Sequence, residues 1–137
     1  MKKSVGIVGC GFIGGALKCW LEKYNPSCNV LISDPPKGYD DNLSNCDVIF
    51  ISIHIKTEDN NIQNLSLLKN ILVKLPNVPI YVRTTILPGT TDLLRQELKK
   101  EIYFMPEFLT ERSAFEDFCQ QPMIFTGNVG LLEKIFL

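Results

Sequence analysis

Three glycines near the start of the chain have the spacing of a phosphate-binding turn. Gly9, Gly11 and Gly14 fit the pattern G-x-G-x-x-G. In this pattern the first glycine permits a tight turn, the second lets a pyrophosphate approach the backbone, and the third lets a helix pack closely on a strand. Free N–H groups and the positive end of the helix dipole then favour an anion at the turn. The spacing therefore predicts binding of a dinucleotide.

An acidic residue follows at the distance that a ribose contact requires. Asp34 lies 20 residues after Gly14, at the end of the apolar run 30–32. Its carboxylate can accept hydrogen bonds from the adenosine ribose hydroxyls, and its charge would repel a 2′-phosphate, so NAD is favoured over NADP. The predicted cofactor contacts are Gly9, Gly11, Phe12, Ile13, Gly14, Asp34 and Thr85.

Two later segments place polar side chains directly after predicted strands. Thr85 follows the apolar run 80–82, and Glu107 and Glu111 follow the run 102–105. In an open parallel sheet, ligands bind in the crevice at the carboxyl ends of the strands. We therefore expect a hydroxyl and two carboxylates at the mouth where a nicotinamide would lie.

The elements that must position these residues alternate between short apolar runs and helical patterns, which is typical of a parallel α/β sheet. Strands are expected at 4–8, 29–33, 48–53, 79–84, 102–105 and 123–126. Helices are expected at 13–23, 62–75, 90–100, 113–118 and from 130 onward. The predicted fold is a single-domain, doubly wound Rossmann-type sheet of about six parallel strands.

One connection is unusually short. Asp34 and Asp47 are 13 positions apart, and Pro35, Pro36 and Gly38 lie between them. A parallel crossover needs a dozen or more residues, so a full helix hardly fits. We expect a loop or a single turn at 42–45.

Composition limits the partners. The chain has 14 basic and 15 acidic side chains without a basic cluster, which argues against nucleic acid. No apolar run approaches the ~20 residues of a membrane span, and the start does not continue as a signal peptide. Five scattered cysteines without a C-x-x-C pair are interpreted most simply as reduced thiols in a cytoplasmic protein. No cluster has metal-ligand spacing.

The segments after the fourth and fifth expected strands resemble those of the nucleotide-sugar dehydrogenases, the UDP-glucose/GDP-mannose 6-dehydrogenase family. Residues 84–91 (TTILPGTT) are similar to the family's S-T-V-P-P-G-T-T. Residues 106–111 (PEFLTE) are similar to its P-E-F-L-R-E, with threonine where arginine is usual. Residues 116–118 match its E-D-F, and residues 47–51 resemble its strand A-D-V-x-F-I.

This resemblance implies an activity and roles for site residues. Members of the family oxidise the C6 alcohol of a nucleotide sugar to a carboxylate with two NAD molecules in turn, using a cysteine nucleophile. By resemblance, Thr85 would position a water or the substrate oxygen, and Glu111 would act as the general base. Glu107, Phe108 and Leu109 would line the sugar site.

The resemblance is to one part of the family's architecture. The family's cysteine and lysine lie in a later segment, G-G-x-C-x-P-K-D, and none of the cysteines here has that setting. We expect residues 1–137 to be an NAD-binding domain without the central dimerising helix and the C-terminal nucleotide-sugar domain. Turnover would then need a second chain.

Two alternatives stay open. One is a stand-alone NAD(H)-binding module without turnover. The other is a small hydroxyacid or prephenate-type dehydrogenase, suggested by residues 14–17 (GGAL). The oligomeric state and the identity of the sugar are not predicted.

Overall fold

The computed structural model describes residues 2–136 and has a six-stranded sheet in the order β3-β2-β1-β4-β5-β6. The strands are β1 (Ser4–Val8), β2 (Asn29–Asp34), β3 (Tyr39–Asp40), β4 (Val48–Ile51), β5 (Ile80–Val82) and β6 (Ile102–Phe104). The α-helices within residues 2–136 are α1 (Phe12–Tyr24), α2 (Ser66–Lys74), α3 (Thr90–Leu98), α4 (Ala114–Gln120) and α5 (Glu133–Phe136). The predicted α/β Rossmann-type domain is confirmed.

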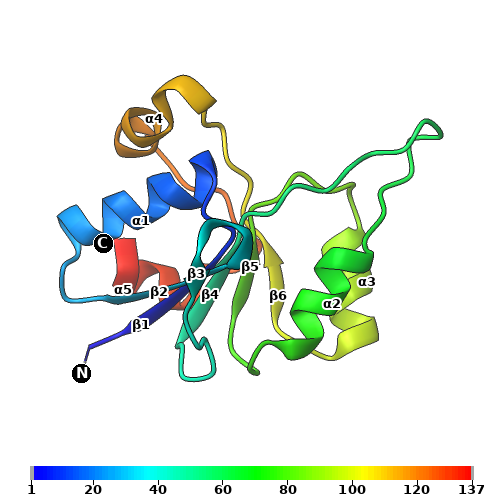
Figure 1. The fold of residues 1–137 in the computed structure, drawn as a ribbon, viewed down its shortest axis with the longest axis horizontal. Coiled ribbons are helices and arrows are strands. Elements are labelled where there is room, and N and C mark those ends of the chain that lie inside the picture. The colour runs from blue at the N-terminus through cyan, green and yellow to red at the C-terminus, as the bar shows by residue number, and fades with distance from the viewer. Residues whose placement is uncertain (1, 137) are drawn as a thin grey trace.

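Helices cover both faces of the sheet, with α1, α4 and α5 on one face and α2 and α3 on the other (Figure 1). Side chains alternate between the faces along each strand. Phe50 of β4 therefore belongs to the same part of the core as Leu17 and Phe118, whereas Ile49 belongs to the part that contains Leu68 and Leu94. All four residues of β4 are buried, as expected for a central parallel strand covered on both sides.

The short connection after β2 folds back as a hairpin. A 3₁₀ turn at Pro35–Lys37 and left-handed Gly38 (φ 83°) reverse the chain, and β3 pairs antiparallel with β2. The expected turn follows at residues 44–45. Leu43 and Cys46 pack into the core on the α2/α3 face. Gly6 leaves space for them, because a Cβ at Gly6 would lie only 3.0 Å from Cys46 Sγ. A loop thus fills the space of a crossover helix.

The sheet corrects two strand predictions. The sheet is mixed, because β3 runs antiparallel to its neighbour. Residues 123–126, predicted as the sixth parallel strand, have no strand structure. Pro122 precedes them, and Met123 and Phe125 are exposed. The Gly127 N–H donates to the Phe104 carbonyl at 3.1 Å, so the segment meets the edge of β6 without extending a ladder.

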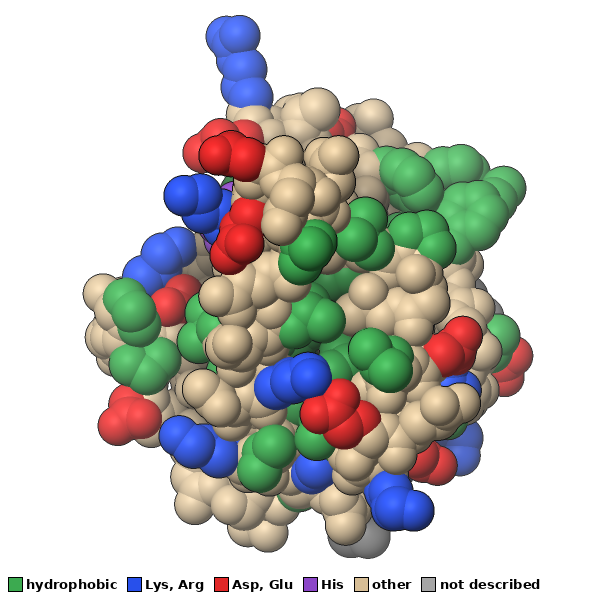
Figure 2. Space-filling view, turned by 90° about the vertical axis from the view of Figure 1, so that its right-hand side faces the viewer, with side chains coloured by type: hydrophobic (Ala, Val, Ile, Leu, Met, Phe, Trp, Pro, Cys, Tyr) green, Lys and Arg blue, Asp and Glu red, His purple; other side chains and the backbone are tan. Residues whose placement is uncertain are grey.

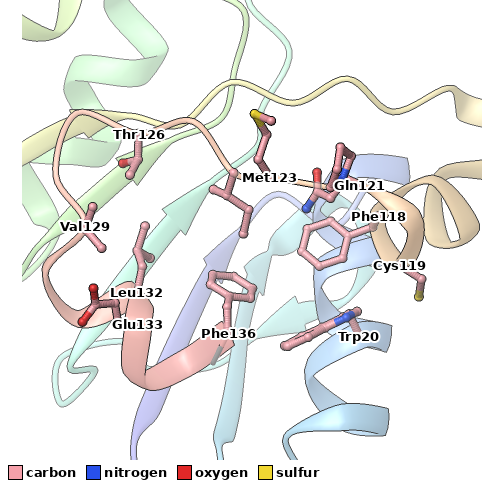
Figure 3. Close-up of a pocket in the computed structure, with 12 residues that line it drawn as sticks. Trp20, Phe118, Cys119, Gln121, Met123, Thr126, Val129, Leu132, Glu133 and Phe136 are labelled. Atoms are coloured by element: carbon pink, nitrogen blue, oxygen red, sulfur yellow. The ribbon is translucent and has the colours of Figure 1, made fainter.

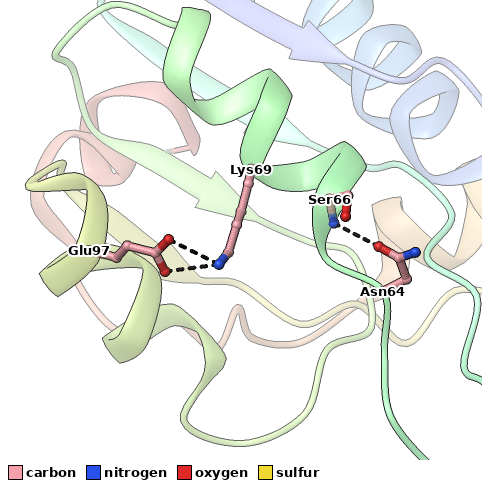
Figure 4. Close-up of polar contacts among 4 residues, drawn as sticks. All are labelled: Asn64, Ser66, Lys69 and Glu97. Carbon is pink, nitrogen blue, oxygen red and sulfur yellow. Dashed lines mark hydrogen bonds and ion pairs between the residues drawn. The ribbon is translucent and has the colours of Figure 1, made fainter.

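The second crossover helix starts later than its hydrophobic spacing predicts. The prediction included Ile62, but α2 begins at Ser66 and Ile62 is exposed. Asparagines favour turns over helix interiors, and the Asn64 side chain accepts a hydrogen bond from the Ser66 N–H at 3.0 Å (Figure 4). Along α2, the Lys69 ammonium lies 2.9 Å from the Glu97 carboxylate of α3 and links the two helices.

The surface carries no dominant charge on the side of α2 and α3. Figure 2 shows that face with lysines, arginines and carboxylates mixed among hydrophobic side chains. This mixture agrees with the near-zero net charge of the sequence. Within residues 2–136, none of the helices has the length and apolar character needed to cross a bilayer.

Candidate functional site

The glycine turn joins the carboxyl end of β1 to the start of α1. Gly9 has φ +86°, and a Cβ there would lie 2.4 Å from the Ser52 carbonyl oxygen. A Cβ on Gly14 would lie 1.9 Å from the Gly9 carbonyl oxygen. Real Cβ atoms do not approach backbone so closely, so both glycines are required by the packing of strand, turn and helix.

Gly11 differs from Gly9 and Gly14, because neither its backbone conformation nor the packing around it requires a glycine. Its φ is −75°, which any residue adopts, and a Cβ there would meet only the Lys37 ammonium, 3.8 Å away. Gly11 caps α1, whose first turn has no acidic residue and no side-chain cap. The first N–H groups of a helix have no acceptor within it. The turn is therefore open on the side where helix donors and dipole favour an anion.

Asp34 and Lys37 flank the glycine turn. The Asp34 carboxylate accepts a hydrogen bond from the Cys10 N–H at 2.8 Å through Oδ2. The Lys37 ammonium donates to the Cys10 carbonyl at 2.9 Å. Burial is the main cause that raises the pKa of the Cys10 thiol, so this thiol is neutral at pH 7. A carboxylate and an ammonium therefore hold the turn from the β2–β3 hairpin.

Sequence reasoning did not identify Lys37. Its ammonium reaches the turn because Pro35, Pro36 and Gly38 build the tight reversal that carries it. The signal that could have identified it is a lysine three positions after the acid, inside a Pro-Pro-x-Gly turn.

The loop after β5 carries Thr85, which is exposed. Its carbonyl accepts a hydrogen bond from Gln63 Nε2 at 3.1 Å, and Gln63 Oε1 accepts one from the Leu87 N–H at 3.0 Å. The neighbouring Thr84 is buried, and its hydroxyl accepts the Ile53 N–H at 3.0 Å. Thr84 thus joins the ends of β4 and β5, while Gln63, which sequence reasoning missed, holds the backbone around Thr85.

The segment after β6 carries the three residues expected at a sugar site. Glu107 is half-buried, and its Oε2 accepts the Leu109 N–H at 2.7 Å. Leu109 packs against the core on the α1 side. Phe108 is 71% exposed and meets the Phe125 ring edge-on at 5.8 Å. Glu107 and Thr85 follow adjacent strands, β6 and β5, at the carboxyl edge of the sheet.

Glu111 lies at the start of a 3₁₀ turn, Glu111–Ser113, and is exposed. Asp117 of α4 holds this turn, because its Oδ2 accepts the Thr110 N–H at 2.9 Å and the Thr110 hydroxyl at 2.7 Å. The Thr110 backbone bond is the main cause that lowers the pKa of Asp117. No hydrogen bond joins Thr85 to Glu111 among the described side chains.

Asp117→Ala is expected to release the segment that carries Glu111. Hydrogen exchange of the Thr110 amide at pH 7 should accelerate by about tenfold, since a charge-assisted hydrogen bond is lost. Because the pKa of Asp117 is lower in the folded state, its anchoring is present above the ordinary aspartate pKa and is lost as pH falls through the lowered value. Glu116→Ala is the control, and equal exchange in both variants would contradict the anchoring role.

Known proteins resemble this chain in structure more than in sequence. No family model and no curated protein matches the chain. GDP-mannose dehydrogenase from Pseudomonas aeruginosa aligns at 19% identity and a TM-score of 0.70, over 99% of this chain and 44% of that protein. The NDP-N-acetyl-D-galactosaminuronic acid dehydrogenase from Methanosarcina mazei aligns at 14% identity and a TM-score of 0.72, over 93% of this chain and 39% of that protein.

A third structural neighbour is an enzyme of a different kind. An imine reductase from Myxococcus stipitatus, solved as a variant with NAD⁺, aligns at 16% identity and a TM-score of 0.64, over 98% of this chain and 50% of its own. The shared fold is Rossmann-type. At these identities the likeness shows the fold alone, and the chain spans half or less of each of these neighbours.

A separate apolar pocket of about 360 Å³ lies on the face that carries α1, α4 and α5. Figure 3 shows Trp20, Phe118 and Phe136 lining it, with Met123 at its rim. None of the predicted site residues lines this pocket, so it is distinct from the glycine turn. Within residues 2–136, no group of three or more His, Cys, Asp or Glu side chains is arranged to hold a metal ion.

Proposed function

We propose that this chain binds NAD(H) as the dinucleotide-binding part of an NAD-dependent dehydrogenase. The open side of Gly11 carries the proposal, because packing within the protein explains Gly9 and Gly14 but leaves Gly11 unexplained. A pyrophosphate approaching the backbone at Gly11 would meet the first N–H groups of α1. The residues present therefore fit the cofactor.

The Asp34 carboxylate fits the ribose contact of the same cofactor. Its Oδ2 accepts the Cys10 N–H, and its second oxygen is the proposed acceptor for the ribose hydroxyls. The Lys37 ammonium, 3.8 Å from where a Gly11 Cβ would lie, is proposed to contact the pyrophosphate. Phe12 and Ile13, in the first turn of α1, complete the contacts.

We further propose that the reaction is oxidation of a nucleotide-sugar alcohol to the acid. The resemblance of residues 84–91 and 106–111 supports this, as do two structural neighbours whose names are those of nucleotide-sugar dehydrogenases. NAD, when bound, supplies the hydride acceptor. Thr85 is proposed to orient the substrate oxygen or a water and to contact the cofactor, and Glu111 to accept the proton from that water.

The sugar is proposed to lie against Glu107, Phe108 and Leu109. The high exposure of Phe108 supports this, because an exposed aromatic ring offers a surface on which a sugar ring stacks. A nucleophilic cysteine and a lysine are proposed to come from outside residues 1–137. Cys28 and Cys46 are buried, and burial raises the pKa of Cys46 to about 11, so these thiols are poor nucleophiles.

The test is an NAD⁺-reduction assay with UDP-glucose and with GDP-mannose, for the chain alone and with a partner chain that carries a G-G-x-C-x-P-K-D segment. NADH should form only in the mixture. NADH formation by the chain alone would contradict the need for a partner. Dinucleotide binding without turnover in the mixture would favour the stand-alone module over the enzyme.

Asp34→Ala should change cofactor preference. It removes the ribose acceptor and the charge that opposes a 2′-phosphate, so the affinity for NADH should fall about tenfold while that for NADPH stays or rises. Isothermal titration with both cofactors measures this. Lys37→Ala is the matched comparison, because a pyrophosphate contact serves both cofactors and its loss should weaken them alike. Equal losses for both cofactors in Asp34→Ala would refute the ribose role.

A further inference from the structure

Arg83 is a buried cation without a partner in the described part of the chain. It follows β5 directly and is 1% exposed. Its Nε and Nη1 atoms are buried and make no hydrogen bond within residues 2–136. A buried charge without acceptors is costly, and native proteins pair such groups. We therefore infer that the guanidinium binds an acceptor that does not belong to the side chains around it.

A second buried polar group lies beside it on the neighbouring strand. The Ser52 hydroxyl is buried and has no hydrogen-bond partner among the described residues. In the sheet register, Ile51 pairs with Val82, and the Arg83 N–H donates to the Ile51 carbonyl at 2.8 Å. Ser52 and Arg83 are the residues that directly follow the paired ends of β4 and β5. By the alternation of side chains along a strand, both lie on the same face as Phe50 and Tyr81, two residues earlier in each strand. The Phe50 and Tyr81 rings stack with their centroids 5.6 Å apart.

The surroundings of Arg83 favour its charge but give Nε and Nη1 no hydrogen-bond acceptor. The Phe118 ring covers the guanidinium, with 5.3 Å between the ring centroid and Cζ. Burial lowers the pKa of Arg83 to about 10, and the nearby Glu107 carboxylate opposes this shift. Arg83 therefore stays cationic at pH 7. Glu107 and Arg83 are not among the ion pairs of residues 2–136, and Glu107 Oε2 accepts the Leu109 N–H.

We propose that Arg83 and Ser52 form a buried subsite for a small carboxylate, between the glycine turn and the segment that carries Glu107. Guanidinium and hydroxyl donors match carboxylate oxygens, and the charge-assisted bonds gain strength where water is excluded. The subsite is at the carboxyl edge of the sheet, because Ser52 adjoins Gly9 on one side and Arg83 precedes Thr85 on the other.

The assignment to a carboxylate rather than a phosphate has two grounds. The phosphates of the proposed cofactor have a separate proposed site at the uncapped start of α1 beside Gly11. Arg83 is 1% exposed, so any group that reaches its guanidinium must be small and must lose its hydrating water. The biological source of the carboxylate rests on the proposed function, in which the oxidised product carries a new carboxylate. The subsite itself rests on Arg83 and Ser52.

Thermal unfolding in formate tests the proposal. The melting temperature of the whole chain is measured from 0 to about 100 mM formate at constant ionic strength, balanced with a bulky sulfonate. A ligand that binds only the folded state raises the melting temperature by mass action. We expect a saturable rise of roughly 5 °C for the unchanged chain. Arg83→Met should show no such rise, whereas Arg95→Met, which alters an exposed arginine on α3, should respond as the unchanged chain does.

Two further measurements on Arg83→Met, its melting temperature without formate and its affinity for NADH, also test the carboxylate subsite. Without formate, Arg83→Met should melt at the same or a higher temperature than the unchanged chain, because an unpaired buried charge is replaced by an apolar side chain. Its affinity for NADH should stay within about twofold. No formate response, or an Arg83→Met variant that is less stable without formate, would overturn the subsite.

A tenfold loss of NADH affinity in Arg83→Met would assign the bound group to the cofactor phosphates and overturn the carboxylate. If the unchanged chain responds to formate but binds no NADH, the proposed function fails while the subsite stands.

Discussion

Gly14→Ala is expected to lower the free energy of unfolding by about 2–4 kcal/mol, the range typical of overpacking against a rigid backbone. The added Cβ would lie 1.9 Å from the Gly9 carbonyl oxygen and 3.0 Å from the Gly9 carbonyl carbon. Neither atom belongs to a flexible side chain, so helix α1 must move away from the turn. Chemical denaturation, read by circular dichroism, measures the loss.

The adjacent helix position supplies the control. Gly15 has no heavy atom within 4 Å of where a Cβ would lie. Gly15→Ala should stabilise the chain by up to about 1 kcal/mol, because alanine has the higher helix propensity. The two substitutions are chemically identical and one position apart. Equal effects from both would show that the contact between Gly14 and Gly9 does not hold the turn in its observed geometry.

Gly11→Leu is expected to abolish dinucleotide binding while the fold remains. The protein leaves the side of Gly11 open, and a leucine there would occupy the path of a pyrophosphate. We expect at least a 30-fold weaker affinity for NADH, or about 2 kcal/mol of binding free energy. The stability cost should be about 1 kcal/mol, the usual difference between glycine and an apolar residue at a helix N-cap.

Comparison of Gly11→Leu with Gly14→Ala separates binding from folding. Gly11→Leu should keep the melting transition and lose NADH binding. Gly14→Ala should show a lower melting temperature as its main effect. A Gly11→Leu variant that binds NADH as tightly as the unchanged chain would show that no ligand approaches the backbone there.

The sequence predicted the parts of the fold that depend on periodic patterns and turn chemistry. The glycine turn, the buried central strand and the helix after Gly89 follow from residue types that one conformation accommodates. The antiparallel strand β3 was missed because it has two residues, and its pairing depends on the left-handed Gly38. Residues 123–126 have strand-like composition, but Met123 and Phe125 are exposed and Ile124 packs against the core without strand pairing.

Motif spacing predicted which residues lie near the glycine turn, but it did not predict contacts made by long side chains that reach across the fold. Asp34 lies beside the turn and accepts the Cys10 N–H, while its expected contact with the ribose stays a prediction. Lys37 and Gln63 act through side chains that span to another loop, and spacing along the chain carries little information about such contacts. Arg83 was not singled out from the sequence, because only the packed structure shows that its guanidinium is buried and has no hydrogen-bond acceptor among the described residues.

The central claim is that the turn at Gly11 binds a dinucleotide, and a fluorescence titration of the chain with NADH tests it most directly. The predicted result is saturable binding with a dissociation constant below roughly 1 mM, within the range usual for enzyme ligands, and its loss in Gly11→Leu. Absence of saturable NADH binding by the folded, unchanged chain would contradict the account.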